Sequence, residues 1–105
     1  MAVVAQGEIW WGELPHEKGR PFLVLTRQSA VTALAAVVVA PVTSRVRNLA
    51  SEIALGSADG LPRECVANFD AISTMRRAHL TRPVGKIAPG RWPEVCEALR
   101  AAIDC

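Results

Sequence analysis

The sequence predicts a mainly β (α+β) fold, a small antiparallel β-barrel followed by one C-terminal helix. Over residues 7–87, short apolar or alternating segments are separated by turn-forming residues, which is typical of consecutive strands. From Arg91 to about Ile103 the apolar residues recur at helical spacing, and Pro89 suits a first helical turn. A row of short strands followed by a single helix favours a barrel that this helix covers.

The first strands are predicted from apolar runs with defined ends. Aromatic and aliphatic residues over 7–14 indicate the first strand. Pro21 fixes the backbone where a second strand begins, over 22–26. Residues 27–34 form a looser connection, and 35–40 are apolar on both faces, which predicts the most buried strand.

The later strands are shorter, and a helix follows them. Residues 51–55 alternate polar and apolar like a half-buried strand, and 56–60 form a turn cluster rich in glycine. Further strand segments are expected at 64–68, 71–74, 79–80 and 84–87. The helix is expected over about 90–103, with an apolar stripe of Trp92, Val95, Cys96, Leu99, Ala102 and Ile103.

At 105 residues the chain is long enough for one domain, which we expect to span 1–105. Its longest apolar stretch, Ala33 to Val42, is about half the length of a membrane-spanning helix, so we expect no membrane association. Residues 1–5 lack the basic start of a secretion signal, which favours a cytoplasmic location. The three cysteines fit neither a disulfide framework nor a zinc site, and Cys65 and Cys96 are expected to pack as small apolar groups.

The net charge of +2 conceals a block pattern. Residues 18–47 hold five basic side chains and no acidic one, and residues 76–91 do the same. Ten of the twelve basic residues are arginine, whose planar guanidinium binds phosphate in a bidentate manner. Two such blocks folded into one patch would favour a nucleic-acid partner, although blocks of this size are also common on ordinary solvated surfaces.

Polar groups lie at the ends of the second and third expected strands. Arg20 stands just before the second strand, and Thr43 and Ser44 end the apolar run of the third. If these strands are neighbours, the guanidinium and the hydroxyls converge on one spot that suits a phosphate. Two alternatives stay open: Arg20 pairs with Glu17 or Glu13, and the hydroxyls bond their own backbone in a turn.

Five motifs, in this order, make nearly the whole chain resemble the MazF/PemK family of toxin endoribonucleases. They are Gly7-Glu8-Ile9-Trp10-Trp11, Arg20-Pro21-Phe22-Leu23-Val24-Leu25, Val39-Ala40-Pro41-Val42-Thr43-Ser44, Cys65 to Thr74, and Val84-Gly85-Lys86-Ile87. The resemblance implies an SH3-like barrel with a C-terminal helix and a homodimer. It also implies cleavage of single-stranded RNA without a metal or other cofactor, and a cognate antitoxin protein that blocks the toxin. Ala71 departs from the pattern, because many members carry Gln there.

The resemblance assigns Arg20 and Thr43 as the catalytic pair. In metal-free cleavage the 2′-hydroxyl of the RNA attacks the adjacent phosphorus, which leaves a 2′,3′-cyclic phosphate and a 5′-hydroxyl. Arg20 suits the charge clamp, but it does not deprotonate, so Glu17 or water is left to take the proton. Candidate RNA contacts, each also open to interpretation as a solvated polar group, are Ser44, Arg45, Arg47, Arg27, Arg76, Arg77 and Glu17.

Other interpretations of the sequence fit it less well. A gyrase poison of the CcdB type shares the implied fold, but it relies on an aromatic residue near the C-terminus, and this chain ends Ala-Ala-Ile-Asp-Cys. A non-catalytic SH3-like adaptor would not need the placement of Arg20 and Thr43. His16 and His79 would suit an acid–base pair but match no catalytic position of the family. Trp11 is expected in the core, and Trp10 at a dimer seam or against a base.

Overall fold

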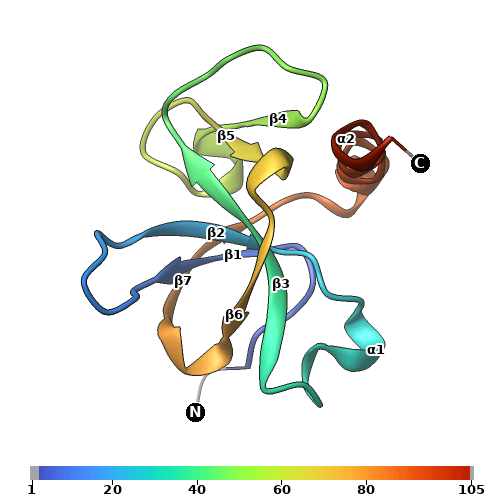
Figure 1. The fold of residues 1–105 in the computed structure, drawn as a ribbon. Coiled ribbons are helices and arrows are strands. Elements are labelled where there is room, and N and C mark those ends of the chain that lie inside the picture. Colours follow the sequence, from blue (N-terminus) through green and yellow to red (C-terminus); the bar gives the residue numbers. More distant parts are fainter. Residues whose placement is uncertain (1–2, 105) are drawn as a thin grey trace.

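A computed structural model describes residues 3–104, in which a seven-stranded antiparallel sheet folds over itself and one longer helix packs against it (Figure 1). The strands are β1 (Glu8–Gly12), β2 (Arg20–Val24), β3 (Ala36–Thr43), β4 (Glu52–Leu55), β5 (Cys65–Asn68), β6 (Ser73–Arg76) and β7 (Leu80–Lys86). The α-helices are α1 (Gln28–Val31) and α2 (Trp92–Ile103). Single 3₁₀ turns are η1 (Ser57–Asp59), η2 (Phe69–Ala71), η3 (Arg77–His79) and η4 (Pro89–Arg91).

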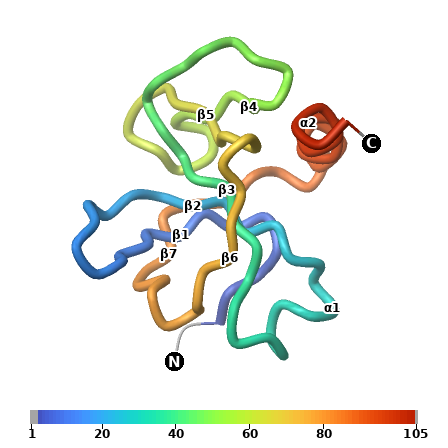
Figure 2. The backbone as a smooth tube through the Cα atoms, viewed as in Figure 1, coloured from blue at the N-terminus to red at the C-terminus, as the bar shows by residue number. Residues whose placement is uncertain are grey.

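Strand β3 organises the sheet, whose order is β4-β5-β3-β2-β1-β7 with β6 also paired to β3. The first half of β3 pairs with β6, its middle with β2, and its last two residues with β5. Figure 2 shows β3 running through the centre of the molecule between these partners. The prediction of a strand over 35–40 is confirmed from Ala36 on, and pairing with β5 carries this strand on to Thr43. The prediction that it is the most buried strand is wrong, because Ala36 and Val38 are only half-buried, whereas three of the four residues of β5 are buried.

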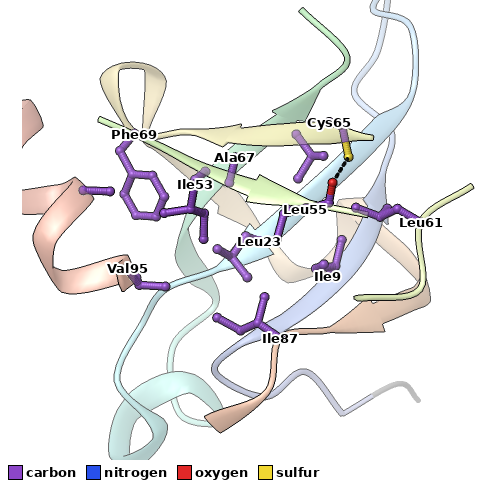
Figure 3. Close-up of a cluster of buried hydrophobic side chains, with 13 residues drawn as sticks. Ile9, Leu23, Ile53, Leu55, Leu61, Cys65, Ala67, Phe69, Ile87 and Val95 are labelled. Carbon is purple, nitrogen blue, oxygen red and sulfur yellow. Dashed lines mark hydrogen bonds between the residues drawn. The ribbon is translucent and has the colours of Figure 1, made fainter. Parts of the chain in front are cut away.

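Apolar clusters fill both sides of the sheet. The first cluster lies between the sheet, β5 and α2 (Figure 3), and its members are Ile9, Leu23, Ala40, Val42, Ile53, Leu55, Leu61, Cys65, Ala67, Phe69, Ile87, Val95 and Ala98. The second lies on the opposite face, and its members are Val4, Trp10, Phe22, Val24, Val31, Val37, Val39, Met75 and Leu80. Burial on both faces explains why the β2 and β3 segments are continuously apolar.

Helix α2 covers one side of the first cluster. Val95 and Ala98 are buried, and Trp92, Leu99 and Ala102 pack partly against the cluster, which confirms the packing of Trp92. Cys96 and Ile103 are exposed, so their predicted place in the stripe is wrong. Cys96 lies one residue beyond Val95, and the turn of about 100° per residue takes it off the buried face. Within residues 3–104 neither α-helix is both long and apolar enough for a bilayer crossing.

The two neighbouring tryptophans of β1 exchange the roles expected from sequence. Trp10 is 3% exposed within the second cluster, and its Nε1 donates a hydrogen bond to Glu8 Oε1 at 3.0 Å. This burial contradicts a place at a dimer seam or against a base. Trp11 is half-buried and faces a cavity described below. Alternation along β1 predicts opposite faces, but with a core on each side it does not tell which tryptophan is enclosed.

The boundaries of several elements also differ from the prediction. The fragments expected at 79–80 and 84–87 join into one strand, β7, because this segment pairs with β1 along its length. Residues 28–31 form the short helix α1 within an expected connection. Strand β6 begins at Ser73 and not at Ala71, because Ala71 ends η2 and Ile72 is the C-cap of that turn.

Candidate active site

Arg20 begins β2 and Thr43 ends β3 at the same edge of the sheet. The register pairs Phe22 with Pro41, and continuing it by two residues sets Arg20 opposite Thr43. Both share a face with Phe22 and Pro41, because residues two apart on a strand point the same way. Both line one cavity of about 250 Å³, called here the central cavity. The structure therefore brings the predicted pair together.

The central cavity is strongly basic. Two further guanidinium groups reach it from the connection after β3, and an amide and a small side chain reach it from the β5–η2 segment. Its lining residues are Arg20, Pro41, Thr43, Arg45, Arg47, Asn68 and Ala71. Three arginines around one hydroxyl suit a polyanionic backbone. Ala71 lies on this wall, so the departure from the family pattern falls inside the site.

Hydrogen bonds from backbone N–H groups to side-chain oxygens hold the connection that carries Arg45 and Arg47. The Arg45 N–H donates to Thr43 Oγ1 at 3.1 Å. The Arg47 and Leu49 N–H groups donate to Glu52 Oε1 at 3.1 and 3.4 Å, which ties this connection to the start of β4. The turn-forming alternative for Thr43 is thus confirmed. Thr43 can still bind a ligand in this turn, because a hydroxyl that accepts one hydrogen bond keeps its own proton to donate.

The alternative prediction, that Arg20 forms an ion pair with Glu17 or Glu13, is wrong. Within residues 3–104 the ion pairs closer than 4.0 Å all involve Arg91, so no carboxylate reaches the Arg20 guanidinium. Glu13 instead accepts a hydrogen bond from Trp11 Nε1 at 3.1 Å. Glu17 lines a neighbouring cavity together with Arg20. Arg20 is exposed and keeps its donors available for a ligand.

Two larger cavities adjoin the central one and share its key residues. The first, about 500 Å³, shares Arg20 and Pro41 and is called here the Lys18 cavity; Glu17, Lys18, Ser73 and Thr74 also line it. The second, about 490 Å³, shares Thr43 and is called here the Trp11 cavity; Trp11, Ser44, Arg63 and Arg82 also line it. Arg20 and Thr43 therefore lie at the two junctions of a three-part groove.

Three of the candidate RNA contacts do not line this groove. Arg27 precedes α1, beyond the end of β2 opposite to Arg20. Arg76 pairs with Ala36 at the start of β3, and Arg77 follows it in η3. Because β2 and β3 are antiparallel, the end that holds Arg20 and Thr43 is the end away from α1, as Figure 2 shows. Ser44, Arg45, Arg47 and Glu17 do line the groove.

The histidines are not brought together at the groove. His16 is exposed in the β1–β2 connection, with a left-handed backbone at φ 66°. His79 lies in η3, where its carbonyl oxygen accepts from the Glu13 N–H at 2.9 Å. Neither lines any of the three cavities. Across residues 3–104, His, Cys, Asp and Glu side chains form no group of three or more that could hold a metal ion.

Sequence reasoning missed several residues of the groove, namely Lys18, Asn68, Arg63 and Arg82, together with the exposed role of Trp11. Arg82 stacks on Trp11, with its guanidinium carbon 5.0 Å from the ring centroid. The two residues are partners in the β1–β7 register. A predicted β1–β7 pairing is the only signal that could have joined them, because they are distant along the chain.

A bent antiparallel barrel with a C-terminal helix and an arginine-lined groove is the structure of a known class of small toxins. Residues 5–103 match the family described as the PemK-like, MazF-like toxin of type II toxin–antitoxin systems. The chain belongs to this family, which confirms the resemblance and the expected fold.

Individual relatives are similar along their whole length. The probable endoribonuclease MazF5 of Mycobacterium tuberculosis is 38% identical, over 99% of this chain and 96% of that protein. The probable endoribonuclease MazF2 of the same species is 39% identical, over 95% and 98%. Among solved structures, the Mycobacterium tuberculosis toxin MazF-mt6 has a TM-score of 0.86 at 34% identity, covering 92% of this chain and 96% of that one. A mycobacterial endoribonuclease solved with its cognate antitoxin has a TM-score of 0.84 at 23% identity, covering 96% and 95%, and shows the shared fold.

Proposed function

We propose that this chain is a toxin endoribonuclease that cleaves single-stranded RNA at selected sequences without a metal ion, with Arg20 and Thr43 as its catalytic pair. The observation that carries the proposal is their position at the two junctions of an arginine-lined groove. A nucleic-acid strand lying along such a groove would place one phosphate in the central cavity and its neighbours in the larger cavities. The names of the relatives MazF5 and MazF2 support the same activity.

The proposed reaction uses the substrate's own nucleophile. The 2′-oxygen attacks the adjacent phosphorus in line, and the bond from phosphorus to the 5′-oxygen breaks. The products are a 2′,3′-cyclic phosphate and a 5′-hydroxyl; one proton leaves the 2′-hydroxyl and one joins the 5′-oxygen. The Arg20 fork binds the non-bridging oxygens as their charge grows, and the Thr43 hydroxyl donates to one of them.

The proton acceptor must be another group, because Arg20 stays protonated and a threonine hydroxyl is a weak base. Glu17 lines the Lys18 cavity on the Arg20 side of the central cavity. It can take the 2′-proton directly or through a water molecule. Its replacement by Gln should slow the chemical step without weakening RNA binding, if it fills this role.

The proposal includes partners that the groove would accommodate. An antitoxin with an acidic, extended segment could lie along the arginine-lined groove and exclude RNA from it. A mycobacterial endoribonuclease of the same fold was solved in complex with its cognate antitoxin, which supports an antitoxin as the partner. We expect the toxin to act as a homodimer, because the groove of one small barrel is short, and in the cytoplasm, where its RNA substrate lies.

The direct test is cleavage of a long single-stranded RNA in excess EDTA, with mapping of the product ends. The proposal predicts cuts at selected sites, cyclic phosphate ends, and loss of cutting in Arg20→Ala and Thr43→Val. Arg100→Ala is the matched control, because Arg100 is exposed on α2 and lines none of the three cavities. Intact RNA, or cutting that requires an added metal, would overturn the proposal; stalled gyrase–DNA complexes beside intact RNA would favour the gyrase-poison alternative.

A further inference from the structure

The Trp11 cavity is built on a row of paired residues. In the sheet register Trp11 lies opposite Pro21 on β2 and opposite Arg82 on β7. Continuing the β2–β3 register sets Pro21 opposite Val42, so four adjacent strands contribute one residue each to this wall. Buried Leu61 and Cys65 of the first cluster close it underneath, at the end of that cluster away from Phe69 and Val95 (Figure 3). The cavity is therefore an opening at one end of the core.

The charged side chains that line this cavity, Arg63 and Arg82, are hydrogen-bond donors only, and the hydroxyls of Thr43 and Ser44 can both donate and accept. The Arg82 guanidinium lies over the Trp11 ring at 5.0 Å, and the indole N–H is occupied by Glu13. Arg63 lines the cavity from the segment after η1. A guanidinium offers five N–H donors and no acceptor. The guanidinium held over the indole ring also provides the kind of surface on which a base packs.

We propose that the Trp11 cavity is a nucleotide subsite that binds a keto base, guanine or uracil, of the residue next to the scissile phosphate. The inference deepens the proposed function and rests on it. Thr43 lines both the central cavity and the Trp11 cavity, so a strand with its phosphate at Thr43 has its next nucleotide at Trp11. The subsite thereby assigns part of the sequence selectivity to residues outside the catalytic pair.

The preference for a keto base follows from the donors. Guanine and uracil present carbonyl oxygens on their edges, whereas adenine and cytosine present an amino group at the equivalent position. An amino group directed at Arg82 or Arg63 would leave donors facing donors. In protein–DNA complexes, arginine against the acceptor edge of guanine is the commonest specific base contact, and it discriminates by about tenfold or more.

The first arm of the test measures cleavage of short oligonucleotides with one ribonucleotide at the cut site. Each flanking position is varied through the four bases, and kcat/KM is compared for the wild type, Arg82→Ala, Arg82→Lys and the control Arg100→Ala. We expect about a tenfold or larger keto preference at one flanking position. Arg82→Ala should remove that preference and raise KM, Arg82→Lys should restore the charge but little of the preference, and Arg100→Ala should match the wild type. Equal rates for all bases at both positions, or a preference that Arg82→Ala leaves intact, would overturn the subsite.

The second arm measures binding without cleavage. The indole N–H resonance of Trp11, assigned with Trp11→Phe, is followed as the 3′-monophosphates of guanosine, uridine, adenosine and cytidine are added. Shifts with the guanosine and uridine compounds at lower concentration support the subsite, and they do so even if RNA is never cut, in which case only the proposed function fails. Cleavage of RNA with no keto-selective shift would overturn the subsite alone. A shift with an acidic peptide but with none of the nucleotides would assign the cavity to a protein partner and also overturn it.

Discussion

Replacing Arg91 with Ala removes the contact that fastens η1 to the start of α2. Its Nη1 lies 3.1 Å from Asp59 Oδ1, and its Nη2 donates to the Ala54 carbonyl oxygen at 2.6 Å and to Glu94 Oε2 at 2.9 Å. Asp59 is 5% exposed, and its other oxygen accepts from the Gly56 N–H at 2.9 Å. Without the guanidinium, one carboxylate oxygen stays buried with no partner.

The size of the loss follows from the exposure of each partner. Removing one member of a buried ion pair costs about 3–5 kcal/mol when both members are enclosed. Here the Arg91 side chain is 28% exposed, and water can replace part of the contact. We therefore expect a fall of about 2 kcal/mol in the free energy of unfolding, or roughly 10 °C in Tm. The contact with Glu94, which is 51% exposed, adds less than about 0.5 kcal/mol.

Urea unfolding of three single variants, and of the two double variants that combine Arg91→Ala with each of the others, checks this reasoning. Arg91→Ala is compared with Glu94→Ala, which removes only the exposed partner, and with Asp59→Asn in a double-mutant cycle. A large coupling energy between Arg91 and Asp59 is expected, and almost none between Arg91 and Glu94. If Arg91→Ala lowers stability no more than Glu94→Ala does, the buried pair does not hold η1 in place and the argument fails.

Three further predictions concern packing, reactivity and charge. Gly85→Ala should destabilise the protein by more than about 2 kcal/mol in urea unfolding, because the new Cβ would clash with the Asp59 carbonyl oxygen of η1. Stability near that of the wild type would contradict this close approach. Burial raises the pKa of the Cys65 thiol, so at mildly alkaline pH a smaller fraction of this thiol is ionised. Iodoacetamide should therefore modify the exposed Cys96 before it modifies Cys65, as read by peptide mass spectrometry. Modification of Cys65 before Cys96 would refute this. Arg45 and Arg47 both line the central cavity, and each phosphate contact to a single strand contributes about 0.7 to the slope of log Kd against log salt concentration. Replacing both by Ala should therefore reduce this slope by about 1.4 for uncleavable single-stranded DNA. An unchanged slope would show that neither arginine contacts a phosphate.

Local patterns were enough to predict the parts of the site that lie within single strands. The apolar runs of β2 and β3 are long enough to identify their ends, and Arg20 and Thr43 stand at those ends. Antiparallel pairing of consecutive strands then places both at one edge of the sheet. The C-terminal helix was predicted for a similar reason, because apolar residues recur at helical spacing along it, although Cys96 and Ile103 of the predicted stripe are exposed.

Properties that depend on distant pairing could not be predicted in this way. Arg27 and Arg76 belong to the same basic blocks as the groove residues, yet strand direction carries them to the other end of the sheet. Charge counts along the chain contain no information on that direction. The stack of Arg82 on Trp11 depends on the β1–β7 pairing, which no local pattern of either strand specifies.

The most direct test of the central claim is the single-turnover rate of RNA cleavage by Arg20→Ala and Arg20→Lys at saturating protein, beside Arg100→Ala. If the Arg20 fork binds the phosphoryl oxygens in the transition state, the Ala variant should be slower by about 10²–10³-fold, and the Lys variant should recover only part of the rate. Arg100→Ala should cleave as fast as the wild type. Cleavage by Arg20→Ala at the rate of the Arg100 variant would contradict the account, because the groove would then cut RNA without the guanidinium at its centre.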